Sequence, residues 1–131
     1  MRKVWVKMCA SFILFGLLSC NRSAMDQRVD FTIDMSTPDN SPLQNLGGYV
    51  YHNDIIIIHD AFGNFYALSK YCTLDLSILN YIASPSYLQC PVDQTEFATN
   101  GSVLNARNGA AGLTTYLTAQ NGNYLRIYSR I

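Results

Sequence analysis

Two cysteines, Cys72 and Cys90, are the residues of this chain whose type and spacing could support chemistry. They stand eighteen positions apart in the stretch "YCTLDLSILNYIASPSYLQCPVDQTEF". Each is followed within three residues by a position where a metal site would place histidine, yet Leu74 and Asp93 stand there. The pair could belong to a metal site, to a disulfide, or to the remains of a site whose chemistry has been lost.

The first nineteen residues are expected to be a signal peptide that precedes the folded domain. Three basic residues, Arg2, Lys3 and Lys7, come before an apolar run from Met8 to Leu18. An apolar run of this length is typical of a secretory signal. It falls short of the roughly twenty residues that a membrane-spanning helix needs.

This segment ends in "LLSC", which resembles the lipobox of bacterial lipoproteins. The resemblance implies cleavage before Cys20 and attachment of a diacylglycerol to its thiol. Because two or more acyl chains hold a protein on a membrane far better than one, we expect a lipid-anchored protein of the bacterial cell envelope. It would face the periplasm or the cell exterior. The alternative is an ordinary signal peptide in which Cys20 has no role.

The mature chain is expected to be mildly acidic. The whole sequence has nine Lys and Arg against nine Asp and Glu, and three basic residues leave with the signal peptide. Six basic residues then face nine acidic ones, for a formal net charge of −3. The remaining basic residues are scattered, which argues against a nucleic-acid partner because such a partner needs a clustered basic surface. Export also places Cys72 and Cys90 in a compartment where disulfides form and persist.

After a short lipidated tether at residues 20–28, we expect one all-β domain over residues 29–131. Residues 29–35 alternate apolar and polar, as a half-buried strand does. Ile55 to Ile58 form an unbroken apolar run of strand-forming residues, which predicts a strand buried on both faces. Short strands about every eight to twelve residues, closed by Gly and Asn turns, indicate a β-sandwich or small barrel.

Three connecting segments complete this organisation. Residues 36–48 carry two prolines and two glycines and are expected to be a loop. Residues 74–82 could form one or two helical turns, or a strand entering a loop. "TNGS" and "QNGN" are Asn-Gly turns, and the second is the strongest hairpin signal in the chain.

The segment "LQCPVDQTEFATNGSVLNARNGAAGLTTYLTAQNGNYLRIY" resembles the second cluster-binding loop of Rieske domains and the strands after it. Upstream, "FYALSKYCTLD" resembles the first loop of that family, Cys-x-His. The resemblance covers about residues 30–128 and implies an antiparallel β-sandwich or small barrel. Its two long loops, around residues 72–87 and 90–96, would meet at one tip. The residues at matching positions are Cys72, Cys90, Pro91, Phe97, Gly101, Leu113 and Tyr116.

The departures from the family concern its cluster. In Rieske domains two cysteines hold one iron of a 2Fe–2S cluster and two histidines hold the other. Leu74 stands in place of the first histidine and has no donor atom. Asp93 stands in place of the second, and its hard oxygen is a poor substitute for imidazole. The glycine after the second histidine is Gln94, and the shielding loop lacks its proline.

We therefore interpret Cys72, Leu74, Cys90 and Asp93 as degenerate ligand positions and expect no cofactor. The alternative is a 2Fe–2S cluster held by Cys72, Cys90 and Asp93. The chain has only two histidines, His52 and His59, and both fall in the strands upstream of the loops. His59, at the end of the isoleucine strand, is expected to be a surface residue.

The resemblance also implies a disulfide between Cys72 and Cys90. In the family both thiolates bind the same iron, which brings their sulfur atoms to roughly 3.7 Å. A disulfide bond is about 2.05 Å long, so small loop shifts would join the two thiols. The bond should stabilise the domain by about 3 kcal/mol. Two reduced, buried thiols are the alternative.

The sequence thus predicts an exported, lipid-anchored Rieske-like module without its cluster, in a binding or structural role. One alternative is a 2Fe–2S electron carrier with altered ligands. Another is a thiol–disulfide switch, which would need an exposed thiol of low pKa. We expect no catalytic activity, because no nucleophile with a base, paired-carboxylate site or phosphate loop is found. Expected partners are the membrane, through the lipid on Cys20, and a protein of the cell envelope.

Overall fold

The computed structural model describes residues 28–106 and 109–131, and the fold is built almost entirely from antiparallel strands. The predicted signal peptide, Cys20 and most of the predicted tether lie outside the described residues. In the described part of the chain, no helix is long and apolar enough to cross a membrane. The first strands are β1 (Asp30–Asp34), β2 (Tyr49–His52), β3 (Ile55–His59), β4 (Phe65–Ser69) and β5 (Asn80–Ile82). They are followed by β6 (Tyr87–Gln89), β7 (Glu96–Phe97), β8 (Val103–Asn105), β9 (Thr115–Asn121) and β10 (Tyr124–Tyr128).

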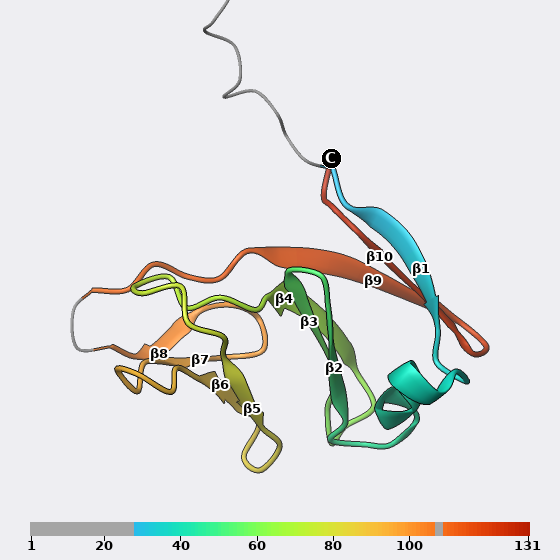
Figure 1. Cartoon of the computed structure of the whole chain (residues 1–131), viewed down its shortest axis with the longest axis horizontal. Coiled ribbons are helices and arrows are strands. Elements are labelled where there is room, and N and C mark those ends of the chain that lie inside the picture. The colour runs from blue at the N-terminus through green and yellow to red at the C-terminus, as the bar shows by residue number, and fades with distance from the viewer. Residues whose placement is uncertain (1–27, 107–108) are drawn as a thin grey trace, which may run out of the picture.

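These strands form two antiparallel sheets. A six-stranded sheet has the order β1-β10-β9-β4-β3-β2, and a four-stranded sheet has the order β5-β6-β7-β8. Figure 1 shows the smaller sheet at one end of the molecule and β1 and β10 towards the other, with the long strand β9 running between them. The expected all-β, antiparallel fold is confirmed.

Strand β3 joins the two halves of the hydrophobic core, because its side chains alternate between two buried clusters. All four isoleucines are buried, as their unbroken run predicts. Ile55 and Ile57 face a cluster formed mainly by side chains of the six-stranded sheet. It includes Ile33, Leu43, Val50, Leu125 and Ile127. Ile56 and Ile58 face a cluster between the sheets that includes Leu68, Cys72, Leu79, Leu88, Cys90 and Phe97. The cysteines therefore lie on the core side of the second sheet.

Two connecting segments differ in detail from the sequence-based expectation. Residues 36–48, expected to be a loop, contain a 3₁₀ helix, η3 (Pro38–Gln44), which buries Leu43 beneath the sheet. In the "QNGN" hairpin the two-residue loop is Gly122–Asn123, because Asn121 still pairs with Tyr124. Gly122 has φ +61° and supplies the left-handed conformation that this loop needs.

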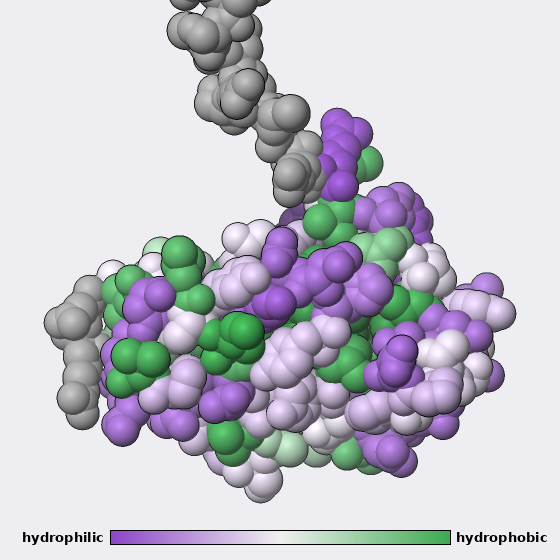
Figure 2. All heavy atoms as spheres, in the orientation of Figure 1, coloured by the Kyte–Doolittle hydropathy of each residue, from purple (hydrophilic) through white to green (hydrophobic). Residues whose placement is uncertain are grey.

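Figure 2 shows one face of the molecule, on which apolar residues are interspersed with polar ones. The exposed large apolar side chains of the described residues include Leu74, Leu76, Ile78 and Val92, all in the two cysteine loops. The apolar surface around the thiols is therefore only partly covered.

Candidate functional site

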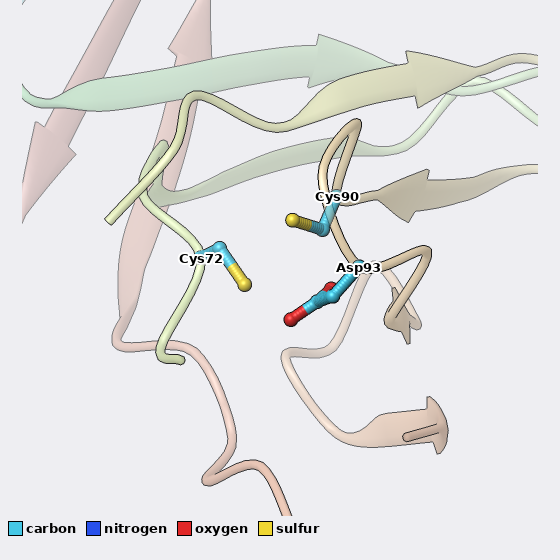
Figure 3. A group of neighbouring side chains, drawn as sticks. All are labelled: Cys72, Cys90 and Asp93. Carbon is cyan, nitrogen blue, oxygen red and sulfur yellow. The ribbon is translucent and has the colours of Figure 1, made fainter. Parts of the chain in front are cut away.

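The two loops that carry the cysteines meet at one tip, as the sequence predicts. One loop follows β4 and contains Cys72, and the other follows β6 and contains Cys90. The two Sγ atoms and a carboxylate oxygen of Asp93 all lie within 4.8 Å of one another. Figure 3 shows the three side chains pointing from the two loops toward a common space. Three of the four proposed ligand positions are thus brought together.

Both cysteines are buried free thiols, and no disulfide joins them. The predicted disulfide is therefore not present here and stays a prediction. Burial raises the pKa of the Cys72 thiol to about 11, although backbone amides of Leu74 and Asp75 oppose that rise by hydrogen bonding to it. A buried thiol with so high a pKa lacks the reactive thiolate on which a thiol–disulfide switch depends.

A second carboxylate, Asp75, lies at the tip and was missed in the sequence-based assignment. Its two oxygens are each 3.7 Å from Cys90 Sγ, and Ser77 Oγ lies 3.0 Å from the same sulfur. The Cys-x-His spacing of the Rieske family assigned the ligand position to Leu74, and Asp75 is the next residue in the sequence. A signal was present, since each cysteine is followed by aspartate at the third position, as Cys72-x-x-Asp75 and Cys90-x-x-Asp93.

Both carboxylates are held as acceptors by local hydrogen bonds. Asp75 accepts from the Ser77 hydroxyl at 2.6 Å and from the Ser77 amide at 3.0 Å, and these bonds lower its pKa. Asp93 accepts from the Thr95 amide at 2.9 Å, which is the main reason that its pKa is also lowered. The charge of Asp75 opposes this lowering, so the two carboxylates lie close enough to repel each other. The tip is therefore an acidic site next to two thiols.

Leu74 and the two histidines supply no ligand to this centre. The Leu74 side chain carries only carbon and is 38% exposed. His52, in β2, stacks on Phe31 with ring centroids 4.6 Å apart. His59, at the end of β3, stacks on Phe65, and its Nδ1 lies 2.8 Å from the carbonyl oxygen of Leu43. His59 is thus half-buried in a contact with the segment of η3, where a surface position was expected.

A third loop, between β8 and β9, borders the first cysteine loop. The Thr73 hydroxyl donates to the carbonyl of Ala111 at 2.7 Å. The base of this third loop is fixed by Gly101, whose carbonyl accepts from the Leu113 amide at 2.8 Å. Gly101 has φ +90°, and a Cβ there would lie 2.8 Å from the Leu113 oxygen, so only glycine fits. Residues 107–108 of this loop lie outside the described residues.

Comparison with known proteins relates this chain to a solved structure. No protein-family model and no curated protein matches the sequence. Among solved structures, the plasma membrane Rieske protein PetC3 from the cyanobacterium Synechocystis PCC 6803 is similar, with a TM-score of 0.50 and 26% sequence identity. The match covers 56% of this chain and 74% of that one. Together with the two sheets and the paired cysteine loops, it shows that this chain has a Rieske-like fold.

Proposed function

We propose that this chain is a lipid-anchored, Rieske-like module of the cell envelope that has lost its iron–sulfur cluster. Its role is to bind a partner or to serve a structural function, without catalytic activity of its own. The observation that carries the proposal is the donor set at the tip, where two thiols and carboxylate oxygens are present and imidazole is absent.

The donors do not fit a Rieske cluster. That cluster needs two cysteines on one iron and two imidazoles on the other. Here Leu74 presents only carbon, and both histidines are engaged in contacts with residues outside the cysteine loops. The second iron would depend on Asp93 alone among the assigned positions, and a hard oxygen is poorly suited to it. No step of the proposed function is therefore routed through a cluster.

A measurement of iron and sulfide tests the loss of the cluster. The full chain is produced in an iron-supplied host, extracted in detergent and purified without air. We expect colourless protein with near-zero iron and acid-labile sulfide. Brown protein with stoichiometric iron and sulfide would overturn the proposal.

The second candidate function is electron transfer by a 2Fe–2S cluster with altered ligands. The observation in its favour is that Cys72 Sγ, Cys90 Sγ and an Asp93 oxygen lie within 4.8 Å of one another. The same purification separates the two functions, because only this candidate gives coloured protein. If colour is found, Asp93→Ala should remove it and Asp39→Ala, at an exposed position in η3, should not.

The lipid anchor rests on the sequence "LLSC" and can be tested separately. Metabolic labelling with a clickable fatty acid should label the wild-type chain and fail to label Cys20→Ala. Cys9→Ala is the matched control, because Cys9 lies inside the predicted signal peptide and should be removed with it. Normal labelling of Cys20→Ala would contradict the anchor.

The exposed apolar residues of the tip support a binding role. Leu76 is 73% exposed and Val92 is 70% exposed, one on each cysteine loop. Together with Leu74 and Ile78, which are also exposed on these loops, they form the apolar surface that a protein partner would cover. A photo-crosslinking residue at position 92 should capture an envelope protein in cells, and the same residue at position 39 should not. Equal capture from both positions would argue against a partner at the tip.

A further inference from the structure

The first cysteine loop is a tight turn closed by its own backbone. The Cys72 carbonyl accepts from the Leu76 amide at 3.0 Å, and the Cys72 amide donates to the Ser77 carbonyl at 2.8 Å. Leu76 has φ +63°, a left-handed conformation that is rare for a bulky residue. Asp75 accepts from the Ser77 amide inside this turn. The loop therefore holds a thiol and a carboxylate in a fixed relation three positions apart.

The second cysteine loop repeats this construction position by position. The Cys90 carbonyl accepts from the Gln94 amide at 3.1 Å, and the Cys90 amide donates to the Thr95 carbonyl at 2.8 Å. Gln94 has φ +65°, and Asp93 accepts from the Thr95 amide at 2.9 Å. The tip thus consists of two equivalent Cys-x-x-Asp turns that face each other.

Contacts between the turns cross from one to the other. Ser77 Oγ of the first turn lies 3.0 Å from Cys90 Sγ of the second, and both Asp75 oxygens lie 3.7 Å from that sulfur. The equivalent hydroxyl, Thr95 Oγ1, is buried and has no hydrogen-bond partner among the described residues. Buried hydroxyls normally have one. The Thr95 hydroxyl is therefore a buried donor beside Asp93 whose bonding within the turns is incomplete.

We infer that the two turns together bind one thiophilic divalent cation, with Cys72, Cys90 and Asp93 as ligands and Asp75 as the fourth. In a tetrahedral zinc site, metal–sulfur bonds of about 2.3 Å and metal–oxygen bonds of about 2.0 Å place sulfur and oxygen ligands about 3.5 Å apart. The separation of 3.7 Å between Cys90 Sγ and Asp75 is close to that value. The donor atoms of Cys72, Cys90 and Asp93 lie within 4.8 Å of one another, so they need an inward shift of at most about 1 Å. Asp75, which is outside that set, closes in on it from its contact with Cys90.

The donor types determine the class of ion. Two thiolates with two carboxylates suit Zn²⁺, whereas Mg²⁺ and Ca²⁺ require oxygen ligands throughout. As each sulfur binds, its thiol releases its proton to solvent. The ion would also balance the repulsion between Asp75 and Asp93. In the first turn Ser77 Oγ contacts Cys90 Sγ of the second turn. By the same correspondence, Thr95 Oγ1 of the second turn would donate to a thiolate at Cys72 of the first.

This inference rests on the proposed loss of the cluster, because the same two thiolates cannot serve both. It goes beyond that proposal by assigning the vacated cysteines, and the previously unassigned Asp75, to a single ion. The bound ion and the predicted disulfide are alternatives, since oxidised sulfur no longer binds the metal.

The test uses the full chain in detergent, reduced with dithiothreitol and desalted without air. Alkylation and peptide mass spectrometry first verify that Cys72 and Cys90 are thiols. Titration with Co²⁺ should then saturate at one ion per chain, with a thiolate-to-cobalt charge-transfer band and the intense visible bands of tetrahedral Co²⁺. Zn²⁺ should displace the cobalt with the same stoichiometry.

Substitutions that keep the turns but remove charge identify the ligands. Asp75→Asn and Asp93→Asn retain an oxygen that can accept the same backbone hydrogen bonds. Each should weaken Zn²⁺ binding at least about tenfold, since loss of even an outer-shell partner costs 10–100-fold. The matched control is Asp34→Asn, because Asp34 accepts from the amide and hydroxyl of Ser36 at 2.9 and 2.6 Å but lies far from the tip in sequence. Its affinity should equal that of wild type.

Several results would overturn the inference. One is reduced, colourless wild-type protein that binds neither Co²⁺ nor Zn²⁺ at one ion per chain. Another is unchanged affinity in both Asp75→Asn and Asp93→Asn, or equal loss in Asp34→Asn. Iron with sulfide in the purified protein would instead contradict the proposed function itself. Thermal unfolding of each metal-free variant checks its fold. Cys90→Ser, which should lower the charge-transfer band by about half or more because one of two thiolates is removed, replaces any variant that fails to fold.

Discussion

Strand β3 and the two cysteine turns both place buried side chains in the same hydrophobic cluster, but they are held in different ways. The isoleucines of β3 are 0–4% exposed and pack on both faces of the strand, which is hydrogen-bonded to β2 and β4. In the turns only the two cysteines and Thr95 are buried, while Leu76 and Val92 in the same turns are largely exposed. The turns are shaped by backbone hydrogen bonds and two left-handed residues.

This difference distinguishes the residues that stabilise the fold, around β3, from the residues that form the candidate site, in the two turns. Burial of apolar area is the main source of folding free energy, and it is concentrated in β3 and its neighbours. The turns bury little beyond two thiols and Thr95, yet both contain a residue other than glycine in the left-handed conformation. Strained conformations persist where the surroundings over-determine them, and they cluster at functional sites. The scaffold should therefore respond to substitution through stability, and the tip through binding.

The largest effect is expected from the centre of β3. Ile57→Ala removes buried methyl and methylene groups from a side chain that is 0% exposed, and it should lower the free energy of unfolding by about 2–5 kcal/mol. Chemical denaturation measures this loss. Leu104→Ala, at a position 57% exposed in β8, is the control and should change stability by less than about 0.5 kcal/mol. Comparable losses at both sites would refute the contrast between scaffold and surface.

A smaller effect is expected from oxidation at the tip. With oxidised glutathione accepting the two electrons, Cys72 and Cys90 should form a disulfide that raises the free energy of unfolding by about 3 kcal/mol. Metal-free protein is compared before and after oxidation, with mass spectrometry identifying the linked peptides. Cys72→Ser is the control and should show no such gain. Mixed glutathione adducts without an internal bond would contradict the predicted disulfide.

The same contrast explains how much the sequence could predict. The isoleucine run and the alternating strands predicted the β-fold, because burial leaves a regular pattern in the sequence. The resemblance to Rieske domains predicted that Cys72 and Cys90 meet at one tip, and they do. The 3₁₀ helix η3 was not predicted, since two prolines within it indicated a loop.

The composition of the site was harder to predict. Asp75 reaches Cys90 across fifteen positions of sequence, and its role depends on a turn whose left-handed residue is leucine. No residue preference indicates such a conformation at leucine, because glycine is the usual signal for it. The repeated Cys-x-x-Asp spacing indicated that Asp75 is equivalent to Asp93, but the ligand spacing of the Rieske family assigned Leu74 instead. Cys20 lies outside the described residues, so its lipidation stays a prediction.

A still smaller effect is expected in the turn between β3 and β4. Burial alone would raise the pKa of Asp60, but hydrogen bonds from the Asn64 and Phe62 amides and the charge of His59 outweigh it, so its pKa is lowered. The stability that this carboxylate contributes is thus present above its unfolded pKa of about 3.9 and is lost as the pH falls below it. Asp60→Asn should flatten the decline in melting temperature between about pH 5 and pH 3, whereas Asp39→Asn should leave it unchanged. A parallel decline in wild type and Asp60→Asn would show that this carboxylate is not coupled to folding.

The smallest effect is expected from the left-handed residues of the two turns, and it should be a gain. A left-handed conformation costs a residue with a side chain about 1–2 kcal/mol, while glycine costs about 0.5–1 kcal/mol in lost freedom on folding. Leu76→Gly and Gln94→Gly should therefore each raise the free energy of unfolding by about 0.5–1 kcal/mol, because both side chains are exposed and lose little packing. Val92→Gly is the control, since Val92 is 70% exposed on the same loop as Gln94 without a positive φ. That variant should be destabilised. If all three substitutions lowered stability alike, the turns would not carry the backbone strain that distinguishes the tip from β3.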